Sequence, residues 1–150
     1  MSAFDAAAFM DATVSEVMDD KFIPVPAGEY PATATKVETR NWQGKKDPSQ
    51  SGIALDIQWE IEDQKVKEVT GRDKVTVKQG IMLDLTEQGG IDIGKGKNIA
   101  LGALRTALGM NSPGQSFSFR MIEGRRAKVK VTQRVDGDKI YNDVAAVTKP

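Results

Sequence analysis

One short segment of the chain combines an aromatic ring with several cations. Residues 40–46 read Arg-Asn-Trp-Gln-Gly-Lys-Lys, so Trp42 lies among Arg40, Lys45 and Lys46, just ahead of an alternating apolar segment. The bases of single-stranded nucleic acid stack on such rings while Arg and Lys neutralise the phosphates. The alternative is a solvated turn whose tryptophan folds back over the edge of the domain. The segment is therefore a candidate base-stacking site, and the rest of the chain must decide between the two interpretations.

The chain contains no cysteine and no histidine. Disulfides, thiolate zinc sites and thiol catalysis are therefore excluded. The usual general base near neutral pH and the Ser-His-Asp triad are missing as well. We expect a protein that is not an enzyme, with no catalytic residue, no metal site and no cofactor.

Carboxylates are the remaining residues that could support catalysis. Asp56, Glu60 and Glu62 alternate along one face of an expected strand, and together with Asp84 they could bind a divalent cation and serve a nuclease. A solvated strand face explains these acids more simply, because exposed strand faces are commonly charged. The same acids would repel DNA from that part of the surface.

A glycine-rich segment at residues 89–96 resembles a phosphate-binding loop. It satisfies the pattern Gly-x4-Gly-Lys but has Gly96 where that loop needs Ser or Thr for magnesium. We interpret the segment either as a flexible basic turn that touches a DNA phosphate beside a helix N-terminus, or as a plain connection from a strand to a helix.

Length and composition indicate one soluble domain. The chain has 150 residues, of which 39% are hydrophobic and 28% charged, as in an ordinary globular protein. No apolar run approaches the roughly 18 residues that a membrane-spanning helix needs. The N-terminus also lacks the pattern of a signal peptide, so we expect a cytoplasmic location, away from membranes.

The charges are unevenly distributed although the formal net charge is zero. Residues 1–20 carry five acids and no cation, whereas residues 94–150 carry eleven cations against four acids. This asymmetry indicates an acidic arm over residues 1–21 and a folded domain over residues 22–150 with a basic surface. The arm either forms a short amphipathic helix, with Phe4, Phe9 and Val14 or Val17 as anchors, or remains mobile.

Alternating apolar residues predict five strands and one helix. The clearest strand is Ile53 to Ile61, where the apolar side includes Trp59 and therefore places it in the core. Asn98 is expected to cap the helix, which Gly109 ends. The third strand is expected to break or bulge at Gln79-Gly80. The predicted elements are strands at 29–39, 53–61 and 75–85, a long polar loop at 41–52, the helix at 98–108, a strand region that begins at 117–121 with Phe117 and Phe119 in the core and continues at 127–131, and a last hairpin strand at 140–147.

This order predicts an all-β domain of the OB-fold type, a five-stranded Greek-key barrel with a helix between the third and fourth strands. In that fold the loop between the first two strands and the loop between the last two flank the ligand groove. Here these loops would be the Trp42 segment and the turn at residues 136–138. A small β-sandwich could share the same order of strands.

Several short sequences resemble those of a known family. They are Pro26-Ala27-Gly28-Glu29-Tyr30, the helix Asn98 to Gly109, Pro113-Gly114-Gln115 and Tyr141-Asn142-Asp143-Val144. Over about residues 22–149 the chain is similar to small phage-encoded, OB-like single-stranded-DNA-binding proteins of phage replication and recombination. Many such proteins end in an acidic tail that recruits partners, whereas this chain ends Val147-Thr148-Lys149-Pro150. We hypothesise that the acidic N-terminal arm takes over part of that role by shielding the basic groove.

The sequence as a whole predicts a protein that binds single-stranded DNA with little sequence preference. Its partners would be the DNA strand, phage recombinase or replication proteins, and further copies of itself in a homo-oligomer. The alternatives are a structural or assembly protein of the phage particle without DNA affinity, and a metal-dependent nuclease. Tyr30 is a further candidate for stacking. The residues expected to bind nucleic acid are Lys36, Arg40, Trp42, Lys45, Lys46, Arg120, Lys128, Lys130, Arg134 and Tyr141.

Overall fold

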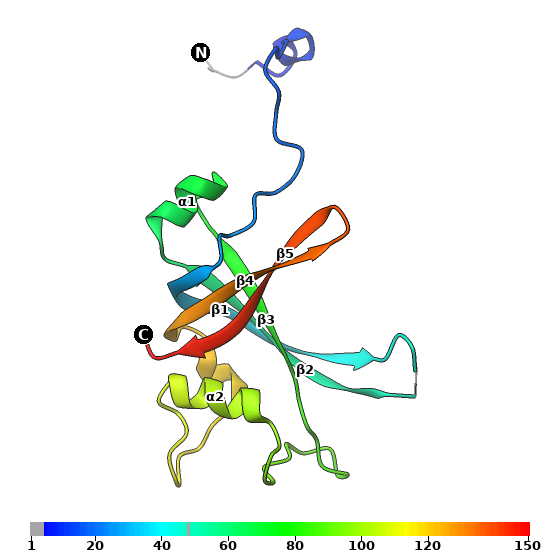
Figure 1. The fold of residues 1–150 in the computed structure, drawn as a ribbon, viewed down its shortest axis with the longest axis vertical. Coiled ribbons are helices and arrows are strands. Elements are labelled where there is room, and N and C mark those ends of the chain that lie inside the picture. The colour runs from blue at the N-terminus through cyan, green and yellow to red at the C-terminus, as the bar shows by residue number, and fades with distance from the viewer. Residues whose placement is uncertain (1–4, 48) are drawn as a thin grey trace.

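The protein is mostly β-structure, arranged as one five-stranded antiparallel sheet with two short α-helices (Figure 1). The computed structural model describes residues 5–47 and 49–150. The order of strands across the sheet is β3-β2-β1-β4-β5. The elements are η1 (Ala8–Asp11), β1 (Gly28–Gln43), β2 (Ser51–Ile61), α1 (Gln64–Thr70), β3 (Thr76–Met82), α2 (Ile99–Ala107), η2 (Phe119–Ile122), β4 (Arg126–Asp136) and β5 (Lys139–Thr148).

Strand β1 organises the sheet because it pairs with different partners along its length. Residues 28–33 pair with β4, and residues 32–43 pair with β2. A bulge between Ala34 and Lys36 separates the two halves, and a bulge increases the local twist of a strand. The sheet is therefore strongly curled, and its edge strands β3 and β5 approach each other (Figure 1). No hydrogen-bonded ladder joins them within the part of the chain that the structure describes, so the sheet is not closed.

The inner face of this curled sheet encloses the core. Strand β2 contributes Leu55, Ile57, Trp59 and Ile61, which are fully buried, as the alternation in the sequence predicts. Inside the core the indole Nε1 of Trp59 donates a hydrogen bond to Oε1 of Gln79 at 2.9 Å. The largest buried side chain thus has its polar atom satisfied, which removes the penalty for burying it.

Helix α2 packs its apolar side onto one end of the core through Leu101 and Leu104. The predicted helix is confirmed, but the capping role predicted for Asn98 is wrong. Asn98 has a left-handed backbone (φ 51°) and its side chain makes no capping bond. It instead accepts from the backbone N–H of Asp84 at 2.8 Å and donates to the carbonyl oxygens of Asp84 and Asp92 at 2.9 and 2.8 Å. Asn98 therefore fixes the loop that precedes the helix.

Three other predicted elements differ from the structure. The segment 64–70 is a helix because Asp63 caps it through Val66 N–H and Gly71 ends it in a left-handed conformation. Strand β3 keeps a continuous register with β2 through Gly80, so the expected break there is wrong. The fourth strand begins only at Arg126, because the segment from Phe119 to Ile122 forms a 3-10 turn. Phe117 and Phe119 nevertheless pack against the core.

The N-terminal arm contains one short 3-10 turn, so the predicted amphipathic helix is not formed over residues 5–20. The expected anchor Phe4 lies outside the described residues. Residues 5–20 are exposed and lead away from the sheet, whereas Val25 at the root of the arm is 1% exposed (Figure 1). The N–H of Val25 donates to Asn142 Oδ1 at 2.8 Å, and its carbonyl accepts from Asn142 and from Gln133, each at 2.9 Å. The arm is thus fixed to strands β4 and β5 at its root.

No helix in the described ranges is both long enough and apolar enough to cross a membrane.

Candidate nucleic-acid interface

Long side chains border a low floor on the outer face of β1, β2 and β3. Strand pairing places Arg40 and Met82 on either side of Ala54, and Lys36 and Lys78 on either side of Gln58. Because the neighbouring residues of β2 are buried in the core, these residues must point outward. We call this surface the β1–β3 face; its border residues are Lys36, Glu38, Arg40, Trp42, Lys78 and Met82.

The floor of the β1–β3 face consists of small residues. Gly52, Ala54 and Gly80 occupy three of its positions. Ala54 is fully buried even though it lies on the outer face, because the longer side chains of Arg40 and Met82 flank it. The face therefore has two separate hollows: Lys36, Asp56, Gln58 and Lys78 help to line one, and Trp42, Ser51 and Gly52 help to line the other.

Trp42 lies within β1 rather than in the predicted loop, opposite Gly52 of β2. A Cβ atom added to Gly52 would lie 2.9 Å from the indole Nε1 and 3.1 Å from Cε2 and Cζ2. One side of the ring therefore rests on the bare backbone of Gly52. The side chain is half-buried, and its Nε1 has no hydrogen-bond partner among the described residues. Trp42 is thus held in a fixed position while part of the ring still faces solvent.

A buried carboxylate orients two cations of the β1–β3 face. Oδ2 of Asp56 is 2.7 Å from Nε of Arg40 and 3.9 Å from Nζ of Lys78. The side chain of Asp56 is 8% exposed, whereas those of Arg40 and Lys78 are 49% and 69% exposed. The negative charge is therefore neutralised in the floor, and the cationic groups remain accessible at the surface.

Glu60 of β2 and Glu62, which follows β2 directly, are also paired with cations. Glu60 lies 3.7 Å from Lys74, and Glu62 lies 2.6 Å from Arg126. Glu62 also accepts a hydrogen bond from the hydroxyl of Thr33. This hydrogen bond, together with the nearby Arg126 guanidinium, lowers the pKa of Glu62 below its usual value. The repulsion of DNA expected from this row of acids is correspondingly reduced.

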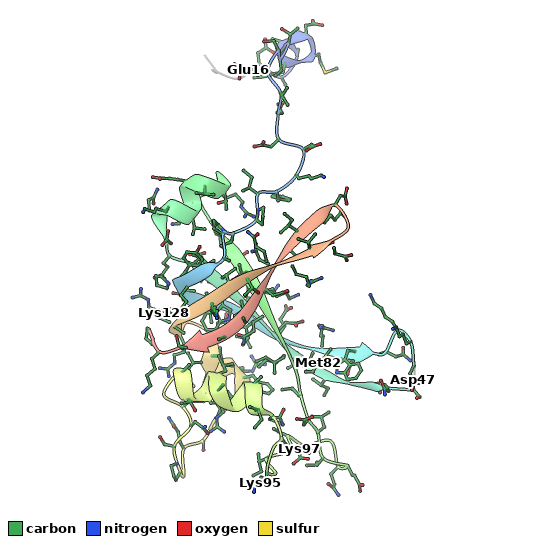
Figure 2. The ribbon with its side chains drawn as sticks, viewed as in Figure 1. Glu16, Asp47, Met82, Lys95, Lys97 and Lys128 are labelled. Atoms are coloured by element: carbon green, nitrogen blue, oxygen red, sulfur yellow. The ribbon has the colours of Figure 1, made fainter. Side chains whose placement is uncertain are left out.

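The cations Lys45 and Lys46 lie in the turn at the end of the β1–β2 hairpin, next to Asp47 (Figure 2). Asp47 accepts hydrogen bonds from the side chain and the backbone N–H of Ser49, and these bonds lower its pKa. The turn continues the β1–β3 face beyond Trp42. Lys36 is 3.2 Å from Glu38 on the same strand.

The remaining predicted residues lie in three other places. Arg120 lines a hollow between η2 and residues 37–39 of β1. Lys128 and Lys130 point outward from β4 beside Pro31 and Glu29 of β1. In Figure 2, Lys128 lies at the opposite side of the molecule from Asp47, with Met82 between them. The structure therefore does not bring the β4 lysines next to Trp42.

The two tyrosines lie in different surroundings, and Tyr141 is 40% exposed. The Arg134 guanidinium lies 5.0 Å from the ring centroid of Tyr141, and Nε of Arg134 is 3.0 Å from Asp143. The hydroxyl of Tyr30 donates to the carbonyl of Pro26 at 2.6 Å, and burial raises its pKa. The Tyr141 ring is thus stacked by its own arginine, and Tyr30 belongs to the packing at the arm's root.

Sequence reasoning missed Lys78 and Met82 as members of the β1–β3 face. The signal was present, because Lys78, Gly80 and Met82 alternate with the core-facing Val77 and Ile81. The expected break at Gly80 concealed it.

Neither the row of acids nor the glycine-rich segment at 89–96 has the geometry that its catalytic interpretation needs. Within residues 5–47 and 49–150, no three acids gather at positions suited to a metal ion. In the glycine-rich segment, the N–H groups of Gly89 and Gly90 donate to Thr86, that of Asp92 donates to the Asp84 carbonyl, and that of Gly94 donates to Asp92 Oδ1. Because these amides are used inside the loop, they do not form a cradle for phosphate.

Comparison of the chain with protein-family models finds no matching family. Comparison with curated proteins likewise finds no match.

Proposed function

We propose that the curled sheet is an OB-like Greek-key barrel. The order β3-β2-β1-β4-β5, with the edge strands close together and α2 between β3 and β4 in the chain, supports this assignment. The β1–β2 and β4–β5 hairpins, which an OB-fold uses to flank its ligand, project toward the same side of the molecule (Figure 1).

The protein's function in this proposal is to bind single-stranded DNA with little sequence preference, in phage replication or recombination. The observation that carries it is the indole of Trp42, which rests on Gly52 on the same outer face as the cations Lys36, Arg40 and Lys78. A base stacks on Trp42, and the cations neutralise phosphates. Stacking and charge neutralisation do not depend on which base is present, which accounts for the small preference among DNA sequences. The protein acts by binding and is not an enzyme.

The direct test is a titration of a fluorescent oligothymidine of about 30 nucleotides, a length that exceeds the site of one OB domain. Fluorescence anisotropy is followed at low and moderate salt, with a duplex of equal length as control. We expect binding that prefers the single strand and weakens as salt rises, because released counterions drive it. Absence of binding at both salt concentrations would contradict the proposal.

A second candidate function is that of a phage structural or assembly protein that uses the arm for docking. The observation that favours it is the exposure of Met10, Val14, Val17 and Met18 along the arm, which is unusual for a segment without a partner. A stable oligomer without salt-dependent DNA affinity would support this function over the first.

A further inference from the structure

A groove lies beside helix α2, and none of the border residues of the β1–β3 face lines it. It runs between the 84–98 loop, α2 and the 109–117 segment. The residues of its lining that matter here are apolar or cationic: Ile91, Ile93, Lys97, Leu101, Arg105 and Phe117. We call it the α2 groove. Lys97 marks it at one end of the molecule in Figure 2, whereas Glu16 of the arm lies at the other end.

The α2 groove is positively charged and partly apolar. The guanidinium of Arg105 lies 4.7 Å from the ring centroid of Phe117, and its Nε donates to the Met110 carbonyl at 3.0 Å. Lys97 has no ion pair within the described part of the chain. The carboxylate in the lining, Asp92, accepts the N–H of Gly94 at 2.9 Å. The groove therefore suits a ligand that carries both apolar and acidic groups.

The rim of the groove exposes large apolar side chains in a fixed loop. Ile93 is 90% exposed and Ile91 is 42% exposed. Asn98 holds this loop through its hydrogen bonds to Asp84 and Asp92. Exposed apolar groups on a preorganised surface are typical of a docking site, because little ordering entropy is lost on binding.

The N-terminal arm has the complementary chemistry. Residues 5–20 contain five acids and no cation. Met10, Val14, Val17 and Met18 are 71–101% exposed and follow one another at i, i+4, i+7 and i+8. On a helix this spacing places the four apolar side chains on one face, and Glu16, with most of the acids, lies away from it. A segment of this kind can fold on binding as a helix in a groove.

We infer that the arm of one copy docks as an amphipathic helix in the α2 groove of a second copy. Apolar side chains of the arm would cover Ile91 and Ile93, and its acids would lie near Lys97 and Arg105. A helix of residues 5–20 would span only about 24 Å. Because Glu16 of the arm lies at the opposite end of the molecule from Lys97 of the groove (Figure 2), we infer that the acceptor is a neighbouring copy. Such a contact joins different surfaces head to tail and builds chains of molecules, which would favour cooperative binding along a DNA strand.

Self-association of the full chain, measured by sedimentation velocity over a concentration series, tests this inference. Val17→Asp disables the arm and Ile93→Asp disables the groove; both side chains are almost fully exposed, so neither change should affect folding. We expect the wild-type mass to rise with concentration, and each variant alone to stay monomeric. An equal mixture of the two variants should form heterodimers and stop there, because it contains one intact arm and one intact groove per pair.

The binding step can be measured separately with a labelled peptide of residues 5–20. Titrated with the full-length Val17→Asp protein, the peptide should bind, and Lys97→Glu in that background should weaken binding by about tenfold, which corresponds to about 1.4 kcal/mol. Lys128→Glu makes the same charge change on β4 and should leave peptide affinity unchanged.

Three results would overturn the inference: a wild-type protein that stays monomeric at all concentrations, self-association that survives Ile93→Asp, and a mixture of the two variants that forms no heterodimer. Peptide binding that is lost in Trp42→Ala but kept in Ile93→Asp would place the arm on the β1–β3 face and would also overturn it. None of these measurements contains DNA, so their failure would be distinguishable from a failure of DNA binding.

Discussion

At the scale of single residues, the packing of Trp42 on Gly52 leads to a prediction about affinity for single-stranded DNA. Trp42→Ala removes the ring that rests on Gly52 and leaves Arg40 and its ion pair with Asp56 in place. We expect a loss of about 1–3 kcal/mol in affinity for single-stranded DNA, as for other bases stacked on aromatic rings. Anisotropy titration measures the loss, and Trp42→Phe, which keeps an aromatic face, should recover part of it. An alanine variant with wild-type affinity would remove the stacking role.

Glu62 makes a prediction about pH. Its pKa is lowered in the folded protein by the Thr33 hydroxyl and by Arg126, so its ionised form stabilises the fold. That contribution is present above the pKa of the unfolded chain and is lost as pH falls through the folded pKa. Glu62→Gln should therefore lower Tm near neutral pH, and the difference from wild type should shrink as pH falls toward about 3.

Differential scanning fluorimetry over that pH range measures both effects on Tm. Glu68→Gln, on the exposed side of α1, is the matched control. A difference between wild type and Glu62→Gln that stays constant with pH would show that the carboxylate's charge is not involved.

At the scale of elements, the sequence predicts well where periodicity is strong and poorly where a single residue sets the conformation. The alternation of β2 is clear in the sequence because its two faces have different environments. Helix α1 was missed because it spans only seven residues and depends on Asp63 and Gly71 rather than on a long apolar stripe. Trp42 was assigned to a loop because the segment that follows it, up to Gly52, is polar and glycine-containing. In the structure Gly52 belongs to β2 and pairs with Trp42, so that β1 continues beyond the predicted end.

The anchoring of the arm on strands β4 and β5 gives a prediction at this scale. Asn142→Ala removes the side chain that bonds both the N–H and the carbonyl of Val25. Because Val25 is buried, its N–H loses the hydrogen-bond partner that the structure gives it, and we expect a loss of about 1–3 kcal/mol in the free energy of unfolding. Gln133→Ala removes a single bond to the same carbonyl and should cost less. Urea unfolding compares the two, and equal stability of wild type and Asn142→Ala would contradict the anchoring role.

At the scale of the whole molecule, two sets of lysines lie on different parts of the outer face of the sheet, and the path of the DNA decides which set contacts it. Lys36 and Lys78 border the β1–β3 face, whereas Lys128 and Lys130 lie on β4 beside the first half of β1. Each phosphate contact with single-stranded DNA contributes about 0.7 to the slope of log affinity against log salt. The double variant Lys36→Ala/Lys78→Ala should therefore reduce that slope by about 1.4, if both lysines contact phosphates. Lys128→Ala/Lys130→Ala removes the same charge and should change the slope little, because its lysines lie away from Trp42. The reverse outcome would move the DNA path from the β1–β3 face to β4, and it would then separate the stacking residue from the cations that were expected to act with it.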